Sequence, residues 1–115
     1  DAEPAVLEKE RGRFLHAPVI VAVIGVYQTP HRIPLIEQQL TSGCVCHALL
    51  QAAQAAGFGA QWLTGWAAYD PTIRTALGLA ANEAVVGFVH IGTPRGAANE
   101  RPRPDPAQRL SDWKG

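Results

Sequence analysis

The 115-residue sequence predicts one domain of the α/β or α+β class, in which helices pack on a central sheet. The length suits a single domain of ordinary size. Apolar residues make up 47 % of the chain, which is enough for a core. Helix-like and strand-like segments alternate in the order α-β-α-β-α-β before a polar tail, and such an alternation is typical of a layered domain.

The first three elements are read from charge order and apolar runs. Residues 1–14 carry acidic residues early and basic residues late, as the dipole of a helix prefers, so they predict the end of a helix. Ala17–Val26 is a continuous run rich in Val and Ile, which predicts a strand covered on both faces. A helix is expected from Pro34 to about Ala56, because Pro is favoured in a first helical turn.

The long helix is the most apolar part of the chain. From Gly43 to Ala56 its polar side chains are His47, Gln51 and Gln54, whose spacing places them on one narrow strip. The rest of the cylinder is apolar, so the helix should be buried on nearly all sides. A domain of this size can hardly surround it, and we therefore expect another layer or a second subunit to cover it.

Glycine and proline mark the later elements. Gly57 should end the long helix as its C-terminal cap. Gly59–Leu63 reads as a short strand that Thr64 and Gly65 turn. Asp70 and Pro71 should cap and begin a helix that ends near Leu77 and Gly78.

The last strand and the tail follow. Glu83–Ile91 predicts a second buried strand. Residues 95–115 predict an extended tail rich in Pro and Arg, because each Pro prevents a helix at its own position and at the one before.

Composition argues against several functions. Ten basic and ten acidic residues give a net charge of zero, whereas nucleic-acid binding needs a basic excess. The apolar run Ala17–Tyr27 is too short to span a membrane. Cys44 and Cys46 point to different sides of a helix and cannot bridge each other. We read them as small buried core residues, with a reactive thiol as the alternative, and expect a cytoplasmic location.

No catalytic or metal-binding motif is visible. The four histidines lack the spacing of metal ligands, and the sequence holds no nucleophile elbow, Walker loop or dinucleotide fingerprint. The strand end Trp62–Gly65 could present backbone N–H groups to a planar heterocycle, or could be an ordinary turn. Arg101 and Arg103, one residue apart in the tail, could hold a phosphate or could simply be solvated.

An ordered set of short segments resembles the C-terminal part of compact NAD(P)H nitroreductases. Each segment is weak alone, but together they cover about residues 10–105 in the family's order and spacing. They are Phe14-Leu15-His16-Ala17-Pro18, Glu37-Gln38, Ser42-Gly43-Cys44, Ala55-Ala56-Gly57-Phe58-Gly59-Ala60, Trp62-Leu63-Thr64-Gly65, Val86-Gly87-Phe88 and Gly92-Thr93-Pro94.

The resemblance implies an α+β nitroreductase-like fold, with residues 1–94 in the domain and 95–115 as the tail. It implies an FMN enzyme that passes a hydride from NAD(P)H to a nitroaromatic, a quinone or a similar acceptor. It also implies a homodimer with the long helix at its centre and the flavin at the interface, and no catalytic side chain. The implied FMN residues are Trp62, Leu63, Thr64, Gly65, Arg101 and Arg103, and the weaker nicotinamide-nucleotide stretch is Ala52, Ala53, Gln54, Ala55, Ala56 and Gly57.

The sequence also departs from that family. The Arg-Arg-Ser helix and the polar elements that complete its flavin pocket have no counterpart here, and His16 stands where the family usually has Arg. We therefore expect the N-terminal half to be absent or to be a separate chain. Two alternatives follow: a non-catalytic dimerisation or small-molecule-binding fragment of the fold, or another flavin reaction such as reductive dehalogenation or flavin destruction.

Overall fold

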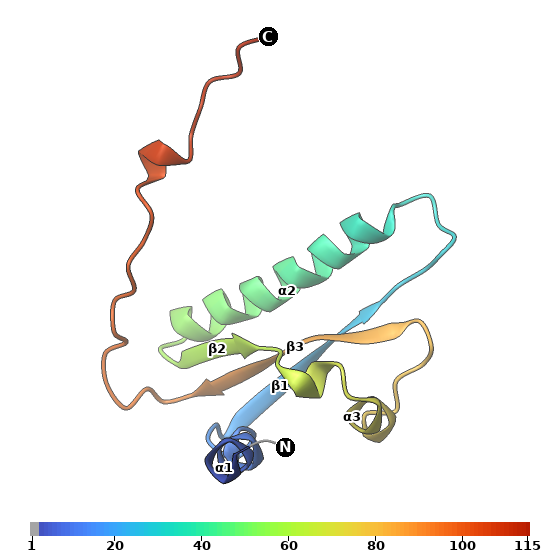
Figure 1. Ribbon diagram of the computed structural model, residues 1–115, viewed down its shortest axis with the longest axis vertical. Helices are drawn as coiled ribbons and strands as arrows, with labels where there is room; N and C mark the ends of the chain where they lie inside the picture. Colours follow the sequence, from blue (N-terminus) through green and yellow to red (C-terminus); the bar gives the residue numbers. More distant parts are fainter. Residues whose placement is uncertain (1–2) are drawn as a thin grey trace.

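A three-stranded antiparallel sheet forms the centre of the computed structural model, which describes residues 3–115 (Figure 1). The strand order is β1-β3-β2, with β1 at Val19–Val26, β2 at Gly59–Leu63 and β3 at Glu83–Gly92. β3 therefore lies in the middle, and Val89 at its centre is fully buried between Val21 and Trp62. The family-derived α+β class is confirmed by this arrangement of helices on an antiparallel sheet.

The helices cover the sheet from two sides. α2 (Leu35–Ala55) lies along one face and contacts all three strands. On the other side lie α1 (Pro4–Gly12), the short 3-10 segment η1 (Trp66–Ala68) and α3 (Pro71–Ala76) (Figure 1). The Phe14 ring, just after α1, packs edge-on against Phe88 of β3 at 5.1 Å between ring centroids.

Most element boundaries agree with the sequence. β2 matches its predicted range, and α2, β3 and α1 agree within about two residues. The predicted cap of α3 is confirmed, because the Asp70 carboxylate accepts hydrogen bonds from the backbone N–H groups of Thr72 and Ile73 at 2.8 and 3.1 Å. Gly57 follows α2 with a positive φ of 83°, as a C-terminal cap requires. Asp1 and Ala2 of the predicted first helix lie outside the described residues.

Within this chain α2 is only partly buried, as expected for a helix that one small domain can hardly surround. α2 buries only Cys46 and Ala53, while Leu40 and Val45 are 63 % and 53 % exposed. β1 was expected to be covered on both faces, but it is an edge strand whose terminal residues Val19 and Val26 are exposed. The sheet covers only one side of α2, and no other element among residues 3–115 covers the rest of the helix. β1 is exposed because it pairs with β3 alone and forms an edge of the sheet.

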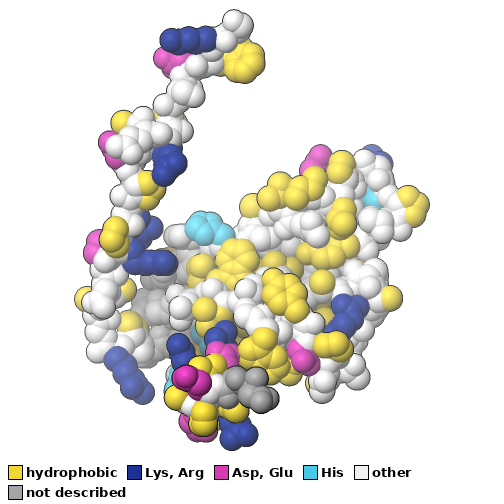
Figure 2. All heavy atoms as spheres, viewed as in Figure 1, with side chains coloured by type: hydrophobic (Ala, Val, Ile, Leu, Met, Phe, Trp, Pro, Cys, Tyr) yellow, Lys and Arg dark blue, Asp and Glu magenta, His cyan; other side chains and the backbone are white. Residues whose placement is uncertain are grey.

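The tail leaves the sheet after β3. Between residues 93 and 115 the structure contains only the 3-10 turn η2 (Pro106–Gln108), where the backbone N–H of Ala107 donates a hydrogen bond to the Asp105 carboxylate. Figures 1 and 2 show this segment running away from the rest of the chain. Within residues 3–115, no helix is long and apolar enough to cross a membrane.

Candidate functional site: the strand-end turn

The turn after β2 is built around Gly65. Its φ of 64° and ψ of −167° lie in a region that is almost closed to other residues. β2 ends its pairing with β3 at Leu63, and neither Thr64 nor Gly65 donates a backbone hydrogen bond to any other residue described. The turn therefore presents two N–H donors next to a residue without a side chain, as the sequence suggested.

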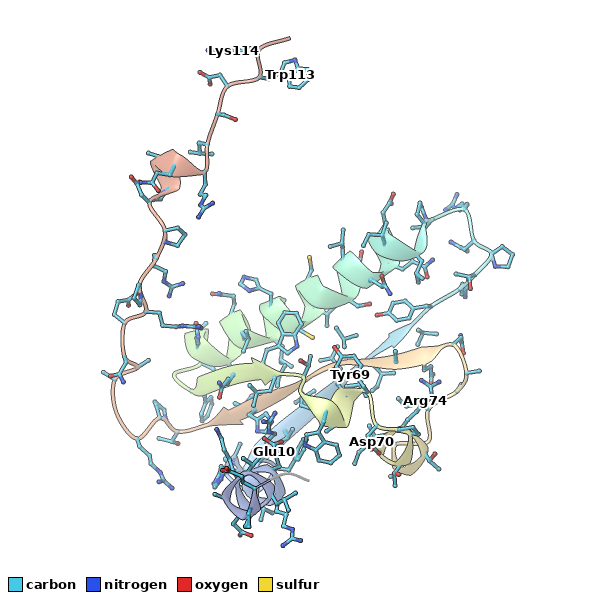
Figure 3. All side chains as sticks on the ribbon, viewed as in Figure 1. Glu10, Tyr69, Asp70, Arg74, Trp113 and Lys114 are labelled. Carbon is cyan, nitrogen blue, oxygen red and sulfur yellow. The ribbon has the colours of Figure 1, made fainter. Side chains whose placement is uncertain are left out.

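Two side chains from α1 and the residue after it hold this turn in place. The guanidinium of Arg13 lies against Gly65, where a Cβ would otherwise stand, and forms an ion pair with Glu10. The second carboxylate oxygen of Glu10 accepts a hydrogen bond of 2.7 Å from Nε1 of Trp66. Figure 3 shows Glu10 on the side of α1 that faces the sheet. Glu10 and Arg13 are both about three-quarters buried, so this pair is more shielded from water than a surface ion pair.

Trp62 does not point into the turn. Its indole lies over Gly87 of β3, and its Nε1 donates a 3.3 Å hydrogen bond to the carbonyl oxygen of Val86. The far edge of the ring reaches Gly43 of α2. Of the four predicted residues, Trp62 therefore packs between sheet and helix, while Thr64 and Gly65 form the turn and Leu63 ends the strand.

A histidine lies on the α1 side of the sheet near Arg13. The His90 ring packs against Phe14 with 5.7 Å between ring centroids, and its buried Nε2 forms no hydrogen bond among the described residues. Burial lowers the pKa of His90, and the positive charge of Arg13 lowers it further. The ring is therefore held in its neutral form more strongly than a free histidine.

A pocket of about 620 Å³ opens on the same side. It lies between α1, the segment leading into β1, and the paired ends of β2 and β3. Arg13 and Leu63 line it, so it adjoins the strand-end turn.

The structure does not bring the two predicted tail arginines to the turn. Arg101 and Arg103 are exposed, and Arg103 Nε lies 3.5 Å from Glu100 Oε1 within the tail itself. From Arg95 onward, no hydrogen bond or ion pair joins the tail to the rest of the described chain. Their role as a phosphate clamp stays a prediction.

The predicted nicotinamide-nucleotide stretch lies at the end of α2. Among Ala52, Ala53, Gln54, Ala55, Ala56 and Gly57, only Ala53 is buried. The backbone N–H groups of Ala56 and Gly57 are already bonded within the helix end. Gln54 is thus the one side chain of this stretch able to form polar contacts.

The cysteine prediction holds for one residue and fails for the other. Cys46 is fully buried under α2, and burial raises the pKa of its thiol. Cys44 was expected to be buried as well, but it is exposed on the other side of the helix. Within residues 3–115, no three His, Cys, Asp or Glu side chains come together as a metal site would require.

Sequence reasoning did not single out Glu10, Arg13 or His90. Glu10 and Arg13 lie three positions apart in a predicted helix, and this spacing indicates an ion pair between them. Nothing in the sequence indicates the contact from Glu10 to Trp66, because those residues meet only through the tertiary fold.

Comparison with known proteins identifies the fold. The Nitroreductase family matches residues 3–93, and the chain belongs to that family. It is 33 % identical over 94 residues to "Putative NAD(P)H nitroreductase YdjA" of Escherichia coli K12, covering 82 % of this chain and 51 % of that protein. It is 35 % identical over 78 residues to "Putative NAD(P)H nitroreductase" of Haemophilus influenzae, covering 67 % and 42 %.

A solved structure agrees. The nitroreductase-like family protein from Bacillus cereus superposes with a TM-score of 0.80 at 22 % identity, covering all of this chain and 63 % of that one. At this identity the likeness concerns the fold. The chain spans about half the length of the curated relatives it matches.

Proposed function

We propose that this chain forms part of an FMN-dependent oxidoreductase that passes a hydride from NAD(P)H to a nitroaromatic, quinone or similar acceptor. Family membership and the names of the two bacterial relatives support the reaction class. The single observation that supports the cofactor is the strand-end turn with its two free N–H donors at Thr64 and Gly65.

The turn fits the edge of a flavin ring. A planar heterocycle with carbonyl and nitrogen acceptors can take hydrogen bonds from adjacent backbone N–H groups. The space that the missing Cβ of Gly65 leaves is taken by the guanidinium of Arg13, so the ring would approach the N–H side of the turn. Bound FMN would supply the hydride chemistry, and the protein would orient it and adjust its electronics. Arg13 would contribute a fixed positive charge behind the turn, partly balanced by Glu10.

The exposed apolar surface supports the predicted homodimer. The chain exposes 9299 Å², whereas a compact monomer of its 12.3 kDa mass exposes about 6100 Å². Part of the excess comes from the tail, but α2 also exposes Leu35, Ile36, Leu40 and Val45 on one element. Figure 2 shows apolar side chains gathered over this helix. A second copy seated on α2 would bury them.

The two tail arginines are the proposed ligands of the FMN phosphate. In a dimer the extended tail could reach over a neighbouring subunit, which would bring Arg101 and Arg103 to an FMN phosphate. Guanidinium groups bind phosphate through paired, charge-assisted hydrogen bonds. The stretch Ala52–Gly57 is retained as the weaker candidate for contact with the nicotinamide nucleotide.

The test removes both guanidinium groups. Replacing Arg101 and Arg103 by Ala should weaken FMN affinity more than tenfold, since two charge-assisted hydrogen bonds contribute about 1.5–3 kcal/mol each. The matched control is Arg95→Ala with Arg109→Ala, which removes the same charge from the same exposed tail. Equal FMN affinity in both double variants would show that the tail is only a solvated segment.

A second candidate function is a non-catalytic dimerisation or small-molecule-binding module of the same fold. The observation that favours it is that, among the residues described, neither tail arginine forms a hydrogen bond or ion pair with the turn. Protein expressed from the complete reading frame separates the two functions: the enzyme oxidises NAD(P)H when FMN and an acceptor are added, and the binding module does not.

A further inference from the structure

The pocket beside the strand-end turn is unusually rich in basic side chains. Two cationic side chains and two histidines from α1, the following loop and β3 line it: Lys9, Arg13, His16 and His90. No Asp or Glu lines the pocket among residues 3–115. Opposite charge is therefore missing from the walls, although the protein as a whole has equal numbers of acidic and basic residues.

Two of these side chains are open to a ligand. Lys9 and His16 are exposed, and neither forms an ion pair or a side-chain hydrogen bond to the residues described. Arg13 is paired with Glu10 on one side, but its charge still reaches His90, whose pKa it lowers. Burial lowers the pKa of His90 most, and the charge of Arg13 adds to it, so Arg13 acts on another group of the same pocket wall.

The rest of the lining is mainly apolar. Ala17, Pro18, Leu63, Ile91 and Pro94 form walls beside the basic groups. A volume of about 620 Å³ lies within the range of sites that hold small organic molecules and far exceeds the share of one water or one simple ion. Because basic side chains line one part of the pocket and apolar side chains another, it suits a molecule with an anionic group at one end and an apolar body at the other.

We propose that this pocket binds a small organic anion, with its carboxylate or phosphate between Lys9, His16 and Arg13 and its apolar body against Pro18, Leu63 and Pro94. Lys9 and His16 stand at the exposed part of the pocket and attract the anion. Arg13 lies deeper and also contacts Gly65, so an occupied pocket adjoins the proposed flavin turn. The site depends on the chain's own residues, whether or not FMN binds.

The first experiment follows the histidine ring protons of the purified chain by NMR during titration with benzoate, with phenyl phosphate, with acetate and with neutral benzamide. Benzoate or phenyl phosphate should shift the His16 and His90 signals saturably, and the stronger of the two identifies the anionic group. Acetate should bind at least roughly tenfold more weakly because it lacks the apolar body, and benzamide should bind more weakly because it lacks the charge.

A matched pair of variants tests the location. Lys9→Gln should weaken binding roughly threefold, as expected for an exposed charge. Arg11→Gln removes a charge from the same helix outside this pocket and should leave the affinity within about twofold. A bound anion should also raise the pKa of His90, because it offsets the field of Arg13.

Three results would overturn the proposal: no saturable shift of His16 and His90 with either aromatic anion, equal binding of benzamide, or equal loss in the two variants. Each can be obtained without flavin. A pocket that does not bind the anion can therefore be distinguished from a wrong proposed function, because the proposed function is tested by FMN binding.

Discussion

The guanidinium of Arg13 fills the space beside Gly65 that a side chain at that position would need. The contact joins the end of α1 to the turn after β2, and Glu10 extends it to Trp66. The conformation of the turn and the position of Arg13 therefore depend on each other.

This relationship makes Gly65→Ala a damaging substitution. The backbone conformation alone should cost about 1–3 kcal/mol for a residue with a Cβ, and Arg13 must also be displaced. Gly78→Ala is the control, since Gly78 has a φ of 68° but open space around it. Urea unfolding should show a larger loss for Gly65→Ala than for Gly78→Ala.

A double variant isolates the Arg13 part of that loss. When Arg13 is already Ala, the added cost of Gly65→Ala should fall toward that of Gly78→Ala, because the collision is gone. If the cost of Gly65→Ala is the same with and without Arg13, the contact has no energetic consequence.

Local chemistry explains which parts of the fold the sequence predicts. The cap of Asp70, the end of α2 at Gly57 and the bounds of β2 each depend on a few adjacent residues, so their patterns were sufficient. The approach of Arg13 to Gly65 and of Trp62 to Gly87 depends on how distant segments pack. No local pattern specifies such contacts.

The sequence also could not predict which side of α2 the sheet would cover. The even apolar surface of α2 indicates that something covers the helix, but it does not say which side the sheet takes. Cys44 and Cys46 show this: both suit a core, yet the sheet covers only Cys46.

The two thiols should react at very different rates. Cys44 is exposed, whereas Cys46 is fully buried and burial raises the pKa of its thiol, which leaves less of the reactive thiolate. With an aromatic disulfide reagent, the monomeric chain should show one fast and one slow phase. Cys44→Ser should abolish the fast phase and Cys46→Ser should preserve it; a fast phase that persists in Cys44→Ser would contradict the burial of Cys46.

Stability should fall in mild acid because of His90. Its pKa is lowered in the folded state, so below the ordinary value of about 6.5 the unfolded chain binds more protons than the folded one. The stabilising contribution is complete above that value and is lost as the pH falls from it toward the folded-state pKa.

The measurement is the urea midpoint between pH 8 and pH 5. His90→Gln does not titrate and should flatten the curve across this interval. His47→Gln, which changes an exposed histidine of α2, is the control and should keep the wild-type slope. An unchanged slope in His90→Gln would assign the pH dependence to other groups.

The proposed dimer predicts a sharp difference between two charges on α2. Val45 is an apolar residue of α2 that is 53 % exposed, and Gln51 is an exposed residue of the same helix that is already polar. Val45→Glu should yield a monomer in light scattering, because burying an unpaired carboxylate is strongly unfavourable. Gln51→Glu should weaken the dimer less, because it changes a residue that is already polar. Circular dichroism checks that both variants fold, and a folded Val45→Glu dimer would exclude this face as the interface.

The visible absorption spectrum tests the central claim most directly. Protein expressed from its complete reading frame and purified with FMN in the buffer, then freed of unbound cofactor, should keep the yellow flavin spectrum and lose it on reduction by NAD(P)H. A folded protein that remains colourless after the same treatment would contradict the assignment of the Thr64–Gly65 turn as part of a flavin site.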